Sequence, residues 1–124
     1  MTTKEKLKKY HDWIFKCSAY QMVLNIIGTD KQTVAPSAGA AYRDERSAYL
    51  AGELFSLETD SETVKLLKEL KDEPEVDAED RRAIELYYKR AMDTLCIPKD
   101  EYVAFKKLCD ESFDAWILAK SKAD

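Results

Sequence analysis

The sequence is poor in the residues that interrupt helices. Its 124 residues include only three glycines and three prolines, so the chain has few places to turn sharply. A fold built from many short strands needs frequent turns, and no segment alternates apolar and polar residues for long enough to predict a strand. A handful of long helices is therefore expected.

Several catalytic signatures are also missing. His11 is the single histidine, whereas the His-Glu-x-x-His motif of zinc peptidases needs two imidazoles four residues apart. A Ser-His-Asp or Cys-His arrangement would have to use His11, and no nucleophile lies at a telling spacing from it. We predict that these 124 residues contain no catalytic residue and no metal ligand, and that His11 is exposed or flanks a helix.

Cysteine is scarce and irregularly placed. Cys17, Cys96 and Cys109 are odd in number, show no Cys-x-x-Cys spacing and lie within apolar periodicity. We interpret them as reduced thiols of the core. No run approaches the roughly 18 apolar residues of a membrane span, and the first nine residues are too polar for a secretory signal. A cytoplasmic protein without a membrane partner is expected.

The charge balance excludes other classes. Charged residues make up 35% of the chain and apolar residues 45%, which is typical of a globular domain and not of a disordered one. The formal net charge of -4 argues against a nucleic-acid partner. The lysines at positions 4, 6, 8 and 9 are interpreted as a solvated helix start.

Apolar periodicity predicts the first two helices. A long amphipathic segment begins near Leu7 and is expected to end near Gly28. A connector around Pro36 then leads into a second helix, in which Gly52 is expected to permit close contact with another helix.

Three further helices follow. A capping box formed by Thr59 and Glu62 predicts the start of the third, Asp77 is the expected cap of the fourth, and Pro98 is expected to head the fifth. The predicted apolar stripe of the fifth helix comprises Tyr102, Phe105, Leu108, Cys109, Ser112, Trp116 and Ala119.

The predicted fold is therefore all-α, with about five amphipathic helices in a compact bundle and a single region spanning residues 1–124. The helical pattern continues from Trp116 to the last residue without a terminating glycine or proline. We expect these residues to be the N-terminal piece of a larger α-helical protein, with its catalytic portion downstream of Asp124.

The connector carries the most specific pattern. Residues 29–43, TDKQTVAPSAGAAYR, resemble the N-terminal signature of the carboxypeptidase Taq family of metallocarboxypeptidases, roughly Trp-Asp-x-x-Thr-x-Met-Pro-x-x-Gly-x-x-x-Arg. The matching residues, at the same spacing, are Asp30, Thr33, Pro36, Gly39 and Arg43. Thr29 and Ala35 depart from the pattern, so two large side chains that would pack around the connector are missing.

Two later stretches are similar to the same family. One is IPKDEYVAF, which contains Pro98, and the other is WILAKSKAD, from Trp116 to Asp124. The resemblance implies a full-length parent that uses zinc or cobalt to activate water and removes amino acids from the C-terminus of peptide substrates. These helices would form a wall or lid of the substrate groove, silent in isolation, with the remainder of the parent chain as their partner. A homodimeric parent is left open.

The same resemblance suggests roles within the connector. Pro36 would fix the entry into the second helix, Ser37 would cap it, and Gly39 would allow a near neighbour. Asp30 and Arg43 would form a salt bridge across the turn.

Two other interpretations stay open at this point. One is a self-contained helical module that binds a partner helix through an exposed apolar stripe. The other is the N-terminal region of a metallopeptidase similar to oligoendopeptidase F, which is also helical and zinc-dependent.

Overall fold

The described part of the chain folds into five α-helices and one 3-10 turn. The computed structural model describes residues 1–123, and within them no strand occurs. The elements are α1 (Thr3–Thr33), η1 (Ser37–Gly39), α2 (Ala40–Thr59), α3 (Ser61–Lys71), α4 (Ala78–Thr94) and α5 (Lys99–Ser121). The all-α prediction is confirmed.

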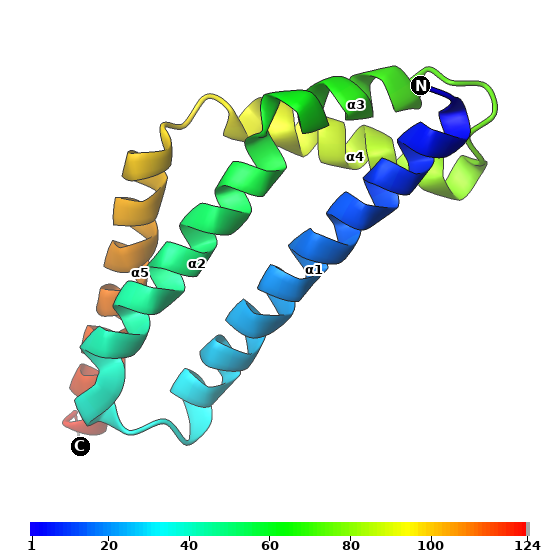
Figure 1. Cartoon of the computed structure of the whole chain (residues 1–124). Coiled ribbons are helices and arrows are strands. Elements are labelled where there is room, and N and C mark those ends of the chain that lie inside the picture. Colours follow the sequence, from blue (N-terminus) through cyan, green and yellow to red (C-terminus); the bar gives the residue numbers. More distant parts are fainter. Residues whose placement is uncertain (124) are drawn as a thin grey trace.

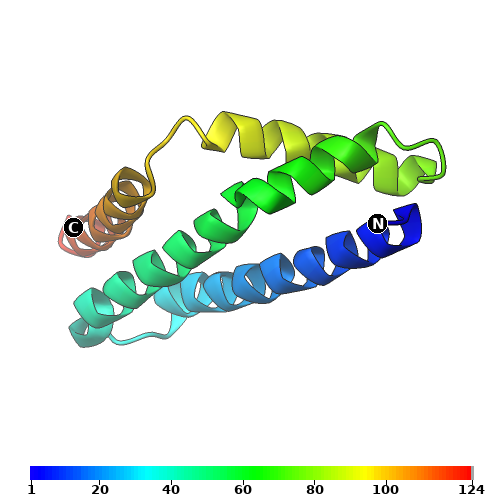
Figure 2. The same cartoon turned by 45° about the horizontal axis from the view of Figure 1, so that its top comes forward.

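Helix α2 is the centre of the arrangement. Helices α1 and α2 form a long antiparallel pair, and α3 and α4 pack on each other at the end of this pair that holds the N-terminus (Figure 1). Helix α5 lies along α2 on the side away from α1, as both views show (Figures 1 and 2). Helix α5 is therefore covered by the rest of the protein on one side only.

The apolar core gathers where α1, α3 and α4 meet. Leu67, Leu70 and Ile84 are fully buried there, and removing each such side chain from water stabilises the fold by about 1.5–3 kcal/mol. Trp13 packs edge-on against Tyr87, with ring centroids 5.3 Å apart. Its indole N–H also donates a hydrogen bond to the Leu57 carbonyl at 2.9 Å, so the polar atom of this buried ring is satisfied.

Helix α1 is longer than the sequence predicts. It passes through Gly28 and ends at Thr33, because a single glycine costs a helix only about 1 kcal/mol. A Cβ atom at Gly28 would meet nothing within 4 Å. The helix ends where the Asp30 carbonyl accepts hydrogen bonds from the amides of Val34 and Ala35, just before Pro36.

Two of the predicted caps are wrong. Helix α3 is capped by Asp60, whose carboxylate accepts from the Thr63 amide at 3.0 Å. The Thr59 hydroxyl instead donates to the Phe55 carbonyl within α2. Ser37 lies inside η1, and neither η1 nor α2 has a side-chain cap.

The other two helix starts agree with the sequence. Asp77 caps α4, because its carboxylate accepts a hydrogen bond from the Asp80 amide at 2.8 Å. Pro98, predicted as the first residue of the fifth helix, is its N-cap, one residue before Lys99. The N–H groups at a helix start have no partner within the helix, so the missing N–H of proline costs little there.

Most of the predicted stripe of α5 faces outward; Tyr102 instead packs on Phe55 of α2, with ring centroids 4.8 Å apart. Phe105, Leu108 and Trp116 are 65%, 58% and 54% exposed, because only α2 packs closely against this helix. Cys96 and Cys109 are likewise exposed, so only Cys17 is the core thiol that was predicted. Within residues 1–123, no helix combines the length and apolar character needed to cross a membrane.

Gly52 brings α2 and α5 together. A Cβ atom at this position would lie 2.7 Å from Cγ2 of Val103, closer than carbon atoms can approach. The absence of a side chain on α2 therefore sets how deeply α5 can pack, as the sequence analysis expected.

We predict that Gly52→Ala destabilises the protein by about 1–2 kcal/mol. The clash with the stiff Val103 side chain costs about 1–3 kcal/mol, and the better helix propensity of alanine offsets up to about 1 kcal/mol. Val103→Ala in the same chain should recover most of the loss, measured as the free energy of unfolding in urea. Purely additive effects of the two substitutions would show that Gly52 is not a contact point.

A second prediction concerns alkaline pH. Burial, with a smaller contribution from Asp80, raises the pKa of Tyr10 to about 12, and burial, with Glu58, raises the pKa of Cys17 to about 11. The ordinary values of 10.0 and 9.0 apply in the unfolded chain, so the unfolded state loses these protons first. The contribution of these two groups to stability should be complete below pH 9.0 and should be lost as the pH rises through the folded-state values.

Tyr10→Phe provides the matched test of this effect. It keeps the ring and removes the titrating hydroxyl, so the free energy of unfolding should decline less between pH 10.0 and 12 than in the unchanged protein. An unchanged slope over this range would contradict the assignment to Tyr10.

Candidate functional site

The connector is organised around Arg43. Its guanidinium Nη1 donates a hydrogen bond to the Pro36 carbonyl at 2.7 Å. A Cβ atom at Gly39 would lie 2.8 Å from the same nitrogen, so Gly39 leaves room for the guanidinium to cross the backbone. The expected near neighbour of Gly39 is therefore Arg43, and three of the signature residues form one structural unit.

The predicted salt bridge between Asp30 and Arg43 is not formed. Asp30 is exposed and has no ion-pair partner among residues 1–123; its role is to end α1 through its backbone carbonyl. The side chain of Thr33 also bonds within its own helix, because its hydroxyl donates a hydrogen bond to the Thr29 carbonyl at 2.7 Å. Arg43 points back to the connector, so the charge that joins the helices has to come from another residue.

That residue is Lys31. Its side chain is 7% exposed, and its ammonium group lies 2.7 Å from Oδ1 of Asp44 and 3.1 Å from Oδ1 of Asp114. It also donates to the backbone carbonyl of Asp110 at 2.9 Å and lies 3.8 Å from the carboxylate of that residue. This Lys31 cluster joins α1, α2 and α5.

The charged groups of the Lys31 cluster shift one another's pKa values. Burial opposes the charged form of Lys31, but the carboxylates of Asp44 and Asp114 outweigh it and raise the lysine pKa. Burial opposes the charged form of Asp44 as well, and Asp114 and Lys31 together lower its pKa. Burial and the neighbouring Asp44 raise the pKa of Asp114. Of the two carboxylates, Asp44 is thus the stronger partner of the lysine.

The cluster holds more acceptors than donors. Oδ2 of Asp44 and Oδ2 of Asp110 are buried without a hydrogen-bond partner. Beside the cluster, a hollow of about 400 Å³ opens between the connector and the last turns of α5, lined in part by Ala35, Arg43 and Phe113. Such a cluster costs desolvation energy and fixes the geometry in which the three helices meet.

The remaining signature residues that the structure describes lie on or next to α5 and not in the connector. Pro98 starts α5 at the end of that helix nearest α4 (Figure 1). Trp116 is exposed on α5, where its ring lies 6.0 Å from that of Phe113 and 5.0 Å from the ammonium nitrogen of Lys120. Asp124 is outside the described residues.

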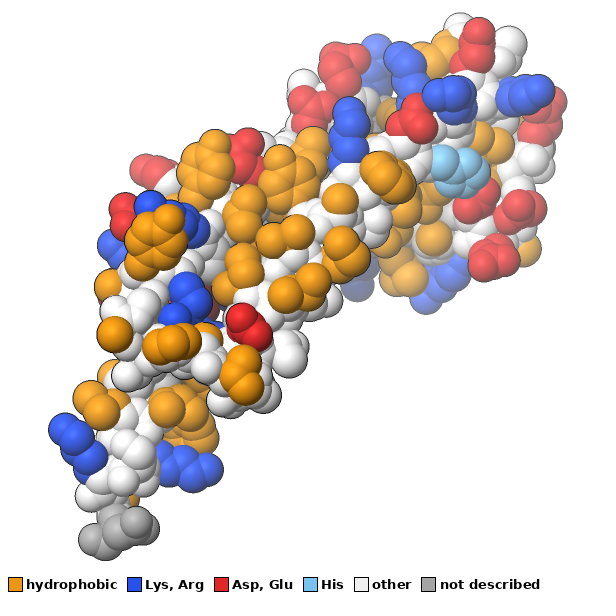
Figure 3. All heavy atoms as spheres, turned by 60° about the horizontal axis from the view of Figure 1, so that its bottom comes forward, with side chains coloured by type: hydrophobic (Ala, Val, Ile, Leu, Met, Phe, Trp, Pro, Cys, Tyr) orange, Lys and Arg blue, Asp and Glu red, His pale blue; other side chains and the backbone are white. Residues whose placement is uncertain are grey.

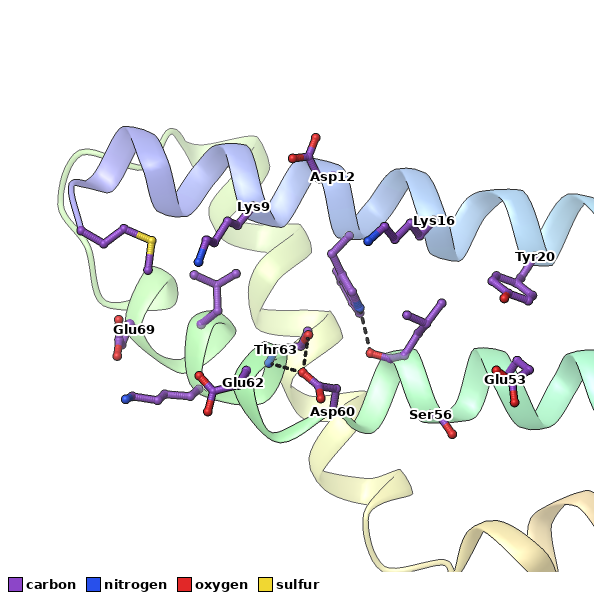
Figure 4. Close-up of a pocket in the computed structure, with 15 residues that line it drawn as sticks. Lys9, Asp12, Lys16, Tyr20, Glu53, Ser56, Asp60, Glu62, Thr63 and Glu69 are labelled. Atoms are coloured by element: carbon purple, nitrogen blue, oxygen red, sulfur yellow. Dashed lines mark hydrogen bonds between the residues drawn. The ribbon is translucent and has the colours of Figure 1, made fainter.

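A second hollow was not predicted from the sequence. The α1–α3 groove, of about 600 Å³, runs between α1 on one side and the last turns of α2 with α3 on the other (Figure 4). Its lining residues are Met1, Lys9, Asp12, Trp13, Lys16, Tyr20, Glu53, Ser56, Leu57, Asp60, Glu62, Thr63, Lys65, Leu66 and Glu69. In the sequence, the only sign of this groove is that Lys9 and Lys16 of α1 are seven residues apart.

The candidate metal ligands do not converge. Within residues 1–123 no group of three or more histidine, cysteine, aspartate or glutamate side chains is arranged to hold a metal ion. His11 is exposed, as predicted, and its Nε2 lies 3.3 Å from the carboxylate of Asp80.

On the face of the molecule that Figure 3 shows, apolar and charged side chains are separated. Hydrophobic side chains gather over the half of the molecule that holds the connector and α5, whereas charged side chains surround His11 at the other end (Figure 3). On α1 the exposed apolar residues include Phe15 at 74% and Ile26 at 59%, and on α5 they include Phe105 and Trp116. An apolar surface of this extent is typical of an interface with other protein.

Comparisons with known proteins agree on one family. The model of the carboxypeptidase Taq (M32) metallopeptidase family matches residues 9–124. The chain is 29% identical over 118 residues to Carboxypeptidase 1 of Bacillus subtilis (strain 168), covering 94% of this chain and 24% of that protein. It also matches the BsuCP crystal structure with a TM-score of 0.92 and 26% identity, over 97% of this chain and 24% of that one. The chain thus spans about a quarter of the length of these relatives.

The Lys31 cluster gives a direct prediction. Lys31→Met should lower the free energy of unfolding by about 3–5 kcal/mol, because it leaves buried carboxylates without their cation. Asp30→Ala, one residue away on the exposed side of the same helix, should change it by less than about 0.5 kcal/mol. Urea unfolding followed by circular dichroism measures both values. Equal losses would show that the buried Lys31 contacts do not contribute to stability as proposed.

Proposed function

The chain belongs to the carboxypeptidase Taq (M32) metallopeptidase family, and from this premise we propose that it forms a wall or lid of the substrate groove in a metallocarboxypeptidase. The proposed reaction is the release of amino acids from the C-terminus of peptides. The observation that carries the proposal is the family match over residues 9–124, supported by the backbone similarity to BsuCP.

In this proposal, the catalytic metal site lies outside these 124 residues. The chain has one histidine, and a two-histidine zinc motif requires another. We assign the catalytic metal, zinc or cobalt, and the residues that activate water to another part of a longer parent protein. These helices would then contribute shape and rigidity, and they would be silent in isolation.

The exposed apolar surfaces support a role as part of a larger body. Phe15 and Ile26 on α1, with Phe105 and Trp116 on α5, would lose contact with water when the remainder of the parent packs against them. The three free thiols support a reducing compartment, and we propose the cytoplasm.

A second candidate is a helical module that binds a separate partner protein. The outward apolar face of α5 favours it as well, because an amphipathic helix from a partner could cover that face. The family match favours the peptidase proposal over this module. The family match also favours the peptidase proposal over the other alternative, the N-terminal region of an oligoendopeptidase F-like metallopeptidase.

A chimera tests the proposal. We expect the isolated chain to release no amino acid from a C-terminally free peptide in the presence of zinc or cobalt. The chain inserted in place of the matching quarter of Bacillus subtilis Carboxypeptidase 1 should support release, whereas that enzyme without the quarter should not. Amino-acid release is followed by chromatography, and circular dichroism verifies that each protein is helical.

Two outcomes would contradict the proposal. One is metal-dependent turnover by the isolated chain, which would place a complete site within it. The other is a chimera that is folded and metal-loaded but inactive, which would show that these helices do not serve as an exchangeable wall of the groove.

A further inference from the structure

The later turns of α5 are tied to the other helices mainly through one residue. The first turns of α5 contact α2 through Lys99, Tyr102 and Val103. Over residues 104–121, every ion pair that joins α5 to another described helix is made by Lys31. The attachment of this half of α5 therefore depends on the state of the Lys31 cluster.

Two carboxyl groups from different helices meet in this cluster. Oδ1 of Asp44 and Oδ1 of Asp114 lie 2.7 Å and 3.1 Å from the same ammonium nitrogen of Lys31. The two carboxyl groups, called here the carboxyl pair, are also in hydrogen-bonding contact with each other. An ionised carboxylate only accepts hydrogen bonds. Such a contact is therefore a bond when one member carries a proton, and otherwise it sets two negative charges side by side.

A buried oxygen of Asp44 lacks a donor. With every carboxyl group ionised, no N–H or O–H of the described residues donates to its Oδ2. Leaving a buried acceptor unpaired costs stability. Because Lys31 already occupies Oδ1, a proton on Asp114 would supply the missing donor at Oδ2.

Solvent access favours Asp114 as the residue that gains and loses this proton. Its side chain is 27% exposed, compared with 3% for Asp44, and it lines the hollow of about 400 Å³. Burial and Asp44 raise the pKa of Asp114. Burial disfavours the charged form of Asp44 as well, but Asp114 and Lys31 outweigh it and lower the pKa of Asp44. Opposite shifts in two touching carboxyl groups are the pattern of a pair that shares one proton.

The other charged groups nearby do not replace the proton. Lys106 lies 3.6 Å from Oδ1 of Asp110, so it balances that carboxylate. Arg43 favours the ionised form of the member of the carboxyl pair that belongs to α2. Neither cation forms an ion pair with Asp114 within residues 1–123. Ionised Asp114 therefore has only Lys31, which it shares with the other member of the pair.

We propose that Asp44 and Asp114 share one proton and that this proton is a latch for residues 104–121 of α5. With the proton in place, Asp114 donates to Asp44 and still accepts from Lys31, so α5 is held to both α2 and α1. Without it, two carboxylates compete for one ammonium group, and this half of α5 is held less tightly. The latch involves contacts within residues 1–123 alone, so it does not depend on the proposed peptidase role.

The direction of the effect with pH follows from Asp114. Its folded-state pKa lies above the unfolded value of 3.8. The contribution of the shared proton to stability is therefore complete below pH 3.8 and is lost as the pH rises through the folded-state pKa. We expect α5 to be held less tightly near neutral pH than in mild acid.

Asp114→Asn tests the latch, because an asparagine side chain donates and accepts at every pH and so resembles the protonated aspartate. Loss of an ordinary ion pair would loosen α5, whereas the latch predicts the opposite. Near neutral pH, amide hydrogen exchange in residues 104–121 should slow by about threefold or more relative to α3. The difference from the unchanged protein should disappear as the pH falls toward 3.8.

Glu111→Gln is the matched control. It removes the same charge from the same helix, at a side chain that is 54% exposed, and it should change exchange in residues 104–121 by less than about twofold. Circular dichroism verifies that both variants keep their helices. A carbon-13 NMR titration of the unchanged protein needs no variant: the carboxyl group of Asp114 should titrate above 3.8 and that of Asp44 below it.

Three outcomes would overturn the proposal. Unchanged or faster exchange in Asp114→Asn near neutral pH would show that Asp114 acts only as an ion-pair partner of Lys31. Equal slowing in Glu111→Gln would show that only net charge matters. Titration of both carboxyl groups below 3.8 would show that they do not share a proton.

Discussion

The contact between Lys31 and Asp44 is the constraint on which the arrangement of the long helices depends. A lysine that is 7% exposed must recover its lost hydration from its neighbours, and here those neighbours come from α2 and α5. Helix α1 reaches the cluster only because it continues past Gly28. The position of the connector, and with it the packing of Arg43 over Gly39, follows from that extension.

Different interactions therefore stabilise the two ends of the molecule. Near the N-terminus, fully buried side chains such as Leu67 and Ile84 supply apolar contacts, whose strength depends little on salt or pH. Toward the connector, the buried contact of Lys31 with Asp44 adds to the apolar burial of small α2 residues such as Ala48, and α5 itself contributes no buried residue. On the face that Figure 3 shows, the half of the molecule with the Lys31 cluster also exposes many apolar side chains.

Local signals in the sequence were sufficient for the helices and for some of their ends. Asp77 and Pro98 could be placed because a cap depends on residues within one turn of it. The family resemblance also rested on a local pattern of residues. The outward orientation of Phe105 and Trp116 could not be predicted, because periodicity identifies an apolar face and not what covers it.

The sequence was also insufficient to identify which charged residues pair with each other. Asp30 and Lys31 are neighbours in sequence, but successive residues point about 100° apart around a helix, so only one of them can face α2. Which one does so depends on whether the helix continues through Gly28, and a single glycine does not decide that. The α1–α3 groove was missed for a related reason, since it arises where three helices diverge and no single segment encodes it.

The two tryptophans report on different parts of this design. Trp13 is sealed in the core with its N–H bonded to a carbonyl, whereas Trp116 is 54% exposed on the outer side of α5. Emission from the first indole follows the integrity of the fold, and emission from the second follows the polarity around α5. The molecule thus has a built-in optical means of separating loss of structure from the arrival of a neighbouring protein surface.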